Sequence, residues 1–112
     1  MRAAERIDTD EDGPTPAAAA VRWAGLAADD QGDTEHCPPF VLLHGLSFDR
    51  RMWRPVMDAL KRIEPGRRVV ALDLPGHGDS PAWPAYDVES LAEGVDRAVP
   101  AAGLAPPVVV GH

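Results

Sequence analysis

Three short runs of apolar residues recur in the second part of the chain, at residues 40–43 (FVLL), 69–72 (VVAL) and 108–110 (VVV). The first run lies between two prolines and Gly45. Short, continuous apolar runs bounded in this way are typical of strands buried on both faces of a parallel sheet. We therefore predict three buried strands. An alternation around Val21 and Trp23 indicates a further short strand nearer the amino end.

The segment between the first two runs has the periodicity of a helix. Its apolar residues recur at helical spacing: Met52, Trp53, Val56, Met57, Leu60 and Ile63. Because Pro55 has no N–H and would break a helix interior, we expect it in the first turn, with the helix beginning near Trp53 or Arg54. Pro65 and Gly66 should end this helix.

A second helix is predicted between the second and third runs. Asp87 can cap its amino end, and Pro100 should end or kink it. Leu91, Val95 and Ala98 would form its apolar face. The resulting order of strand, helix, strand, helix, strand predicts an α/β fold, a parallel βαβαβ sheet with helices on both faces. In such sheets ligands bind at the carboxyl ends of the strands.

The first part of the chain has a different composition. Nine of the 18 acidic residues but only three of the 11 Lys and Arg residues lie in the first 36 positions. The net charge is therefore −6 there and −1 in the remainder, out of −7 in total. We interpret residues 1–19 as a disordered acidic and Ala/Pro-rich leader, and residues 20–112 as a truncated domain. Residues 29–33 (DDQGD) are expected to form a polar, turn-rich loop.

These properties exclude several classes of function. Residues 37–112 are nearly neutral and so lack the basic face that binding to nucleic acid requires. The apolar runs are too short to cross a membrane, and the amino end has no signal-peptide pattern. Cys37 is the only cysteine, so neither a disulfide framework nor a paired-cysteine metal site is expected. A reducing, cytoplasmic location fits this composition.

The first candidate site motif is residues 43–46 (LHGL), at the end of the first buried strand. Backbone N–H groups fixed in a turn after a strand can stabilise the negative charge that develops on a carbonyl oxygen during acyl transfer. Gly45 would allow the close backbone approach that such a turn needs. The alternative is an ordinary tight turn with a structural histidine at His44.

The second motif, residues 73–80 (DLPGHGDS), resembles glycine-rich patterns without satisfying them. A dinucleotide-binding G-x-G-x-x-G would need glycine where Pro81 stands, and the GK[ST] ending of a phosphate-binding loop is absent. Ser80 does not fit a nucleophile elbow, because G-x-S-x-G would need glycine where Ala82 stands. We expect this segment to shape a loop beside the site.

The third motif is the strand at residues 108–110 running into Gly111 and His112. A G-x-S-x-G elbow lifts a nucleophile above the sheet on a strained turn between a strand and a helix. If Gly111 is its first glycine, His112 is the x residue and the nucleophile is the residue that follows.

Four segments, taken in their order and spacing, closely resemble the α/β-hydrolase fold family: residues 40–46, 52–56, 73–80 and 109–112. The resemblance implies that the Leu46 N–H forms one half of an oxyanion hole, with His44 and Gly45 shaping the turn. It also implies that the nucleophile, acid and histidine base all follow His112, so His36, His44, His77 and His112 are not the general base. Their spacing matches no metal-binding pattern, and no cofactor is expected.

The function implied is that of a serine hydrolase acting on an ester, lactone or thioester bond of a small acyl substrate. Two alternatives stay open: a non-catalytic member that binds a small ligand, and a dehalogenase or epoxide-type hydrolase with an aspartate nucleophile. The 112-residue chain is expected to be inactive and poorly stable by itself, because one sheet edge would be unpaired and one face bare.

Overall fold

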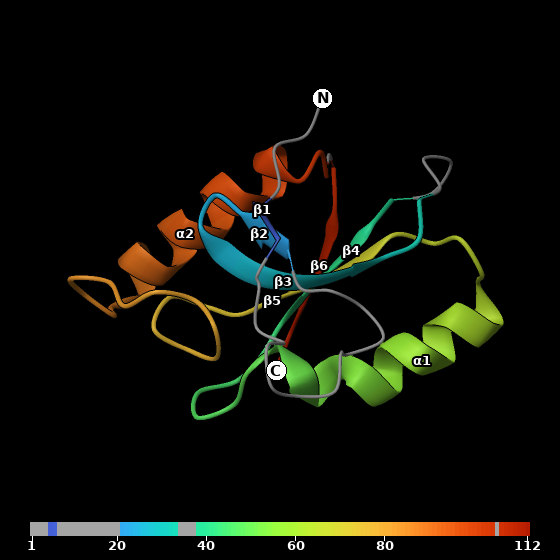
Figure 1. Ribbon diagram of the computed structural model, residues 1–112, viewed down its shortest axis with the longest axis horizontal. Coiled ribbons are helices and arrows are strands. Elements are labelled where there is room, and N and C mark those ends of the chain that lie inside the picture. Colours follow the sequence, from blue (N-terminus) through green and yellow to red (C-terminus); the bar gives the residue numbers. More distant parts are fainter. Residues whose placement is uncertain (1–4, 7–20, 34–37, 105) are drawn as a thin grey trace.

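The computed structural model describes residues 5–6, 21–33, 38–104 and 106–112. Strands alternate with helices along most of this part of the chain (Figure 1). The strands are β1 (Glu5–Arg6), β2 (Val21–Trp23), β3 (Leu26–Gln31), β4 (Phe40–Leu43), β5 (Val69–Leu72) and β6 (Val108–Gly111). The helices are the 3₁₀ helix η1 (Arg50–Trp53) and the α-helices α1 (Arg54–Ile63) and α2 (Val88–Ala101).

The described strands form one sheet in the order β1-β2-β3-β5-β4-β6. Strand β4 pairs in parallel with β5 on one side and with β6 on the other. These are the three strands predicted from the apolar runs, and the predicted parallel βαβαβ unit is confirmed. Strands β2 and β3 extend the sheet as an antiparallel hairpin, so the whole sheet is mixed.

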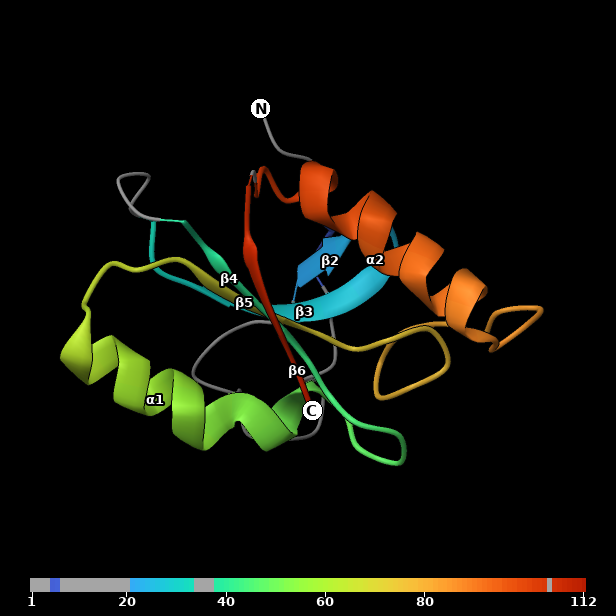
Figure 2. The same cartoon turned by 180° about the vertical axis from the view of Figure 1, so that it is seen from behind.

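The helices cover opposite faces of the sheet, as Figures 1 and 2 show. Helix α2 buries Ala98 in a cluster with Val41 and Val70, whereas α1 buries Met57 in a second cluster with Leu42. Neighbouring strand residues point to opposite faces. This alternation explains why Val41 and Leu42 belong to different clusters, and the predicted placement of helices on both faces is confirmed.

Both helices begin as predicted. Helix α1 starts at Arg54 with Pro55 as its second residue, where the missing N–H has no helical partner to lose. The Asp87 carboxylate caps α2 by accepting a hydrogen bond from the Ser90 N–H at 2.7 Å. Pro100 lies in the last turn of α2, which ends one residue later at Ala101.

The prediction of a turn-rich loop at residues 29–33 was wrong for Asp29, Asp30 and Gln31. These residues are part of β3 and pair with β5. Asp29 is buried beside Arg50, and Asp30 binds Arg68 with an Nη2–Oδ2 distance of 2.7 Å. A carboxylate can occupy a covered strand when a cation neutralises it, and both cations lie far away in the sequence.

The strand at residues 108–110 was predicted correctly, but its predicted burial was wrong. All residues of β6 are exposed, Val109 at 52%. Among the described residues β6 has a partner on one side only, namely β4. The apolar run therefore predicted the strand but not its exposure, because β6 lies at the edge of the sheet among the described residues.

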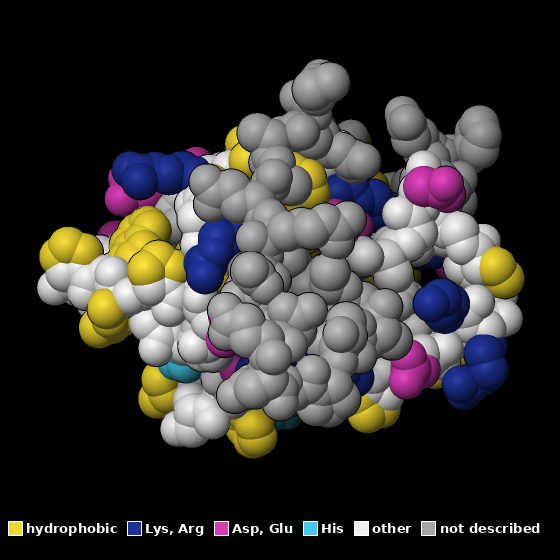
Figure 3. All heavy atoms as spheres, viewed as in Figure 1, with side chains coloured by type: hydrophobic (Ala, Val, Ile, Leu, Met, Phe, Trp, Pro, Cys, Tyr) yellow, Lys and Arg dark blue, Asp and Glu magenta, His cyan; other side chains and the backbone are white. Residues whose placement is uncertain are grey.

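Strand β1 lies within residues 1–19, the segment interpreted above as a leader. Glu5 and Arg6 form β1, which pairs antiparallel with β2; the other leader positions lie outside the described residues. On the face shown in Figure 3, acidic and basic side chains are interspersed over α1. Hydrophobic side chains gather at the opposite end, around the start of α2. Tyr86 and Val88, which lie close to each other in sequence around this start, are both exposed.

Candidate active site

The carboxyl ends of the three parallel strands meet at one edge of the sheet. Leu43 of β4 is in register with Leu72 of β5 and with Gly111 of β6. The segments that follow these strands are therefore neighbours: the turn after β4, the loop at residues 73–80 and the end of β6. The three motifs recognised in the sequence thus lie together at one place, where parallel sheets bind ligands.

His44 is a structural part of the turn that follows β4. The residue is only 3% exposed. Nε2 accepts a hydrogen bond from the Leu74 N–H at 3.0 Å, and Nδ1 lies 2.9 Å from the Gly45 carbonyl oxygen. Acceptance at Nε2 places the ring proton on Nδ1, which donates to the carbonyl. Both ring nitrogens are therefore used, and neither is available to act as a base.

The turn itself projects from the sheet at Leu46, Ser47 and Phe48. It is closed by a 3.1 Å hydrogen bond from the Phe48 N–H to the Gly45 carbonyl. Ser47 has a positive φ of 75°, which is uncommon for a residue other than glycine and is often found at functional sites. Leu46 is 82% exposed, and its N–H donates to no atom within the part of the chain that the structure describes. This N–H is a free backbone donor at the strand edge.

Gly45 and His112 bring the turn against the end of β6. The His112 N–H donates to the Leu43 carbonyl at 3.1 Å, and the His112 ring packs edge-on against Phe48 with centroids 5.9 Å apart. A Cβ atom at Gly45 would lie 3.0 Å from Nδ1 of His112 and 3.3 Å from its carbonyl oxygen. Glycine at this position permits the close approach of the two segments.

The loop at residues 73–80 is organised by the Asp73 carboxylate, which is completely buried. Oδ1 accepts from the Arg50 N–H at 2.7 Å, and Oδ2 accepts from the Asp79 N–H at 2.9 Å. The Ser80 hydroxyl donates to the Asp73 carbonyl at 2.6 Å and accepts from the Ala27 N–H at 2.9 Å. Ser80 is thus a buried loop anchor, in keeping with its rejection as a nucleophile.

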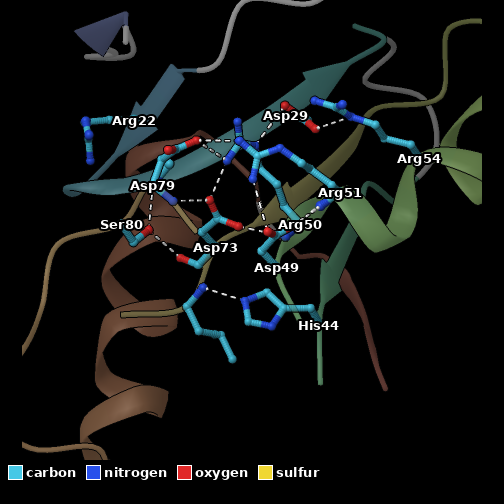
Figure 4. Close-up of polar contacts among 12 residues, drawn as sticks. Arg22, Asp29, His44, Asp49, Arg50, Arg51, Arg54, Asp73, Asp79 and Ser80 are labelled. Atoms are coloured by element: carbon cyan, nitrogen blue, oxygen red, sulfur yellow. Dashed lines mark hydrogen bonds and ion pairs between the residues drawn. The ribbon is translucent and has the colours of Figure 1, made fainter. Parts of the chain in front are cut away.

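Arg50 is the centre of a buried charged cluster that the sequence analysis missed (Figure 4). Its guanidinium binds three carboxylates: Asp29 from β3, Asp73 from the end of β5 and Asp79 from the following loop. Three carboxylates around one guanidinium leave an excess of negative charge, which two exposed arginines reduce. Arg51 contacts Asp79 at 3.0 Å, and Arg54 contacts Asp29 at 3.5 Å.

These contacts change the acidity of the groups involved. Burial by itself lowers the pKa of Arg50, but hydrogen bonds to Asp29 and Asp79 and the charge of Asp73 raise that pKa above its usual value. Partial burial raises the pKa of Asp79, whereas the Arg50 hydrogen bond and the charges of Arg50 and Arg51 outweigh this and lower it. Arg50 and Asp79 are therefore held in their charged forms.

The lowered pKa of Asp79 predicts that the protein loses stability in acid. The folded-state pKa lies below the unfolded value of about 3.9. The carboxylate therefore stabilises the fold above that pH, and this contribution is lost as the pH falls through the folded pKa. We expect the melting temperature of the full-length protein to exceed that of Asp79→Asn at pH 7, and we expect this difference to be smaller at a pH well below about 3.9. A difference that is the same at both pH values would contradict this assignment.

The remaining candidate residues have simple placements. The His77 ring lies 4.9 Å from that of His44, and its Nδ1 is 3.0 Å from the Pro75 carbonyl. His36 and Cys37 lie outside the described residues.

Within the described ranges, no cluster of three or more His, Cys, Asp or Glu side chains is placed to hold a metal ion. No helix in these ranges is long and apolar enough to span a membrane.

Comparison with known proteins agrees with this geometry. The chain is 36% identical over 75 residues to the sn-1-specific diacylglycerol lipase ABHD11 of Mus musculus, a match covering 67% of this chain and 24% of the lipase. It is 34% identical over 61 residues to a pimeloyl-[acyl-carrier protein] methyl ester esterase of Legionella pneumophila (strain Paris), covering 53% of this chain and 24% of that enzyme. The chain thus spans about a quarter of the length of these relatives.

Among solved structures, a marine microorganism esterase superposes with a TM-score of 0.69 at 26% identity, covering 78% of this chain and 31% of the esterase. Residues 38–112 match the sequence profile of the family described as alpha/beta hydrolase fold. This range includes the turn after β4, the Asp73 loop and the end of β6. The chain therefore belongs to the α/β-hydrolase fold family, at the level of hydrolases with esterase and lipase relatives.

Proposed function

We propose that this chain is the amino-terminal part of a serine hydrolase that cleaves an ester, lactone or thioester bond of a small acyl substrate. The observation that carries the proposal is the juxtaposition of the free Leu46 N–H with the end of β6, across the close contact of Gly45 and His112. Lipase and esterase relatives support the same reaction class. The proposal applies to a longer protein, because the chain spans only about a quarter of these relatives' length.

In the proposed mechanism, the residue after His112 is a serine on a nucleophile elbow. Its oxygen attacks the acyl carbon while a histidine from a later part of the protein takes the hydroxyl proton. The carbonyl oxygen becomes an oxyanion that accepts a hydrogen bond from the Leu46 N–H. The leaving alcohol or thiol departs with the proton, and water then releases the acid from the acyl-enzyme. No step requires a cofactor, and we propose a cytoplasmic location from the single cysteine.

Covalent labelling of the full-length protein tests this proposal. A fluorophosphonate reacts with activated serines, and trypsin cleavage after Arg50, Arg68 and Arg97 separates the candidate residues. We expect the label on the peptide that begins at Ala98, together with hydrolysis of a p-nitrophenyl ester that the label blocks. The peptide that begins at Val69 contains Ser80 and serves as the internal control, which should stay unlabelled.

The other outcomes distinguish the alternatives. Label on the peptide that contains Ser80 would contradict the assignment of the elbow. An aspartate after His112, with no labelling, would favour the dehalogenase or epoxide-type alternative. Ester binding without turnover or labelling would favour a non-catalytic member of the family.

A further inference from the structure

The turn that carries the Leu46 N–H is anchored at both ends to two consecutive residues, Asp73 and Leu74. At its beginning, His44 Nε2 accepts from the Leu74 N–H at 3.0 Å. At its end, the Arg50 N–H donates to Oδ1 of Asp73 at 2.7 Å. The Arg50–Asp73 anchor is buried, and the His44–Leu74 anchor is partly buried, with His44 itself 3% exposed. One short stretch after β5 therefore determines where the turn after β4 begins and where it ends.

Between these anchors the turn has little support of its own. Its other hydrogen bonds to the described residues are all local. The Gly45 carbonyl accepts from the Phe48 N–H and from Nδ1 of His44, the Asp49 carboxylate accepts from the Arg51 N–H and guanidinium, and the Asp49 carbonyl accepts from the Met52 N–H. The Phe48 ring adds one edge contact to His112. Because Leu46 is largely exposed, the position of its N–H depends on the two anchors rather than on packing around it.

The Asp73 anchor is in turn fixed by the Arg50 side chain. The guanidinium binds Oδ2 of Asp73, while Nε donates to Asp29 Oδ1 at 3.0 Å. Asp29 lies in the middle of the sheet, in β3, where it pairs with Ala71 of β5. The Arg50 side chain thus holds the Asp73 carboxylate against the sheet (Figure 4). The Arg50 N–H binds the same carboxylate and so fixes the end of the turn.

We propose that Arg50 and Asp73 are positioning residues that hold the Leu46 N–H in place for the oxyanion. This inference rests on the proposed function. A hydrogen bond to developing charge loses much of its value when its donor is displaced by about 1 Å. Removal of the Arg50 side chain should therefore weaken stabilisation of the oxyanion about tenfold, although that side chain touches no reacting atom.

The test uses the full-length protein and a pair of inhibitors. A trifluoromethyl ketone accepts the nucleophile at its carbonyl carbon, and its oxygen becomes an oxyanion as the proton passes to the histidine base. The corresponding alcohol binds the same pocket without forming that charge. The ratio of their inhibition constants is measured for the wild type, Arg50→Met, Arg50→Lys and Asp73→Asn. Inhibition constants describe only the folded, active molecules, so a loss of stability does not alter them.

Arg68 provides the matched control. It is also a buried arginine paired with an aspartate of β3, but it lies at the opposite end of β5 and bonds to Asp30 and the Ala102 carbonyl. We expect Arg50→Met to weaken ketone binding about tenfold and to lower kcat more than it raises KM. Arg50→Lys should restore part of the loss. Arg68→Met should leave the inhibitor ratio unchanged.

The outcomes separate this inference from the proposed function. An active wild type in which the Arg50 and Arg68 variants have the same inhibitor ratio overturns the positioning role alone. A wild type that neither hydrolyses esters nor binds the ketone overturns the proposed function and, with it, this inference. If Arg50→Met does not fold, Arg50→Lys and Asp73→Asn decide the question, because both keep a polar partner in the cluster.

Discussion

Replacement of Arg50 by methionine is expected to lower the free energy of unfolding by about 3–5 kcal/mol, because it leaves the buried Asp73 carboxylate without its cation and Asp29 with only the exposed Arg54. Asp73 has no exposed surface and Asp29 is 5% exposed, so water cannot replace the guanidinium at either group. Methionine fills a similar volume but offers no charge. Urea denaturation of the full-length protein measures the change.

The neighbouring Arg51 is the control for this prediction. Its guanidinium also binds two aspartates, Asp49 and Asp79, but its side chain is 45% exposed. Exposed ion pairs contribute little, so Arg51→Met should cost less than about 1 kcal/mol. Equal losses of unfolding free energy in the two variants would mean that burial does not determine how much the Arg50 cluster contributes to stability.

Replacement of Gly78 by alanine is expected to cost about 3 kcal/mol. Gly78 has a φ of +52°, which costs an alanine roughly 1–2 kcal/mol. A Cβ atom there would also overlap the Asp73 carboxylate, which Arg50 and the backbone of the following loop hold in place. The carboxylate would have to move away from its partners. Thermal and urea denaturation of the full-length protein test this loss.

Gly25 separates the two contributions to that cost. It has a φ of +88°, but a Cβ atom at Gly25 would have no neighbour within 4 Å. Gly25→Ala should therefore cost only the backbone part, roughly 1–2 kcal/mol. A Gly78→Ala variant as stable as Gly25→Ala would show that the Asp73 carboxylate can shift freely.

The parallel part of the fold could be predicted because its signals are local. The run at residues 69–72 is apolar on both faces, and Pro55 and Asp87 mark where the two helices begin. These features depend on residues a few positions apart. The strand order and the placement of the helices then follow from the general rules for strand-helix-strand units.

The features that could not be predicted depend on distant residues. Nothing near Asp29 reveals that Arg50 will neutralise it, so the local pattern indicates a loop where the fold has a covered strand. The same holds for Val109, whose apolar character predicts burial but whose neighbours determine exposure. The close contact of Gly45 and His112 could not be predicted either, because it depends on the register in which β4 pairs with β6. The positions of the motifs could be recognised in the sequence, but the cluster that holds them could not.

The anchoring of the turn at His44 and Arg50 also affects how this protein can diversify. The donor at Leu46 belongs to the backbone, so any residue except proline can supply it. The Leu46 side chain is exposed, and the attachment of the turn to the loop after β5 does not depend on it. Under the proposed function, the side chain at this position can therefore be varied to change substrate preference, in evolution or in a laboratory library, without altering the attachment of the turn.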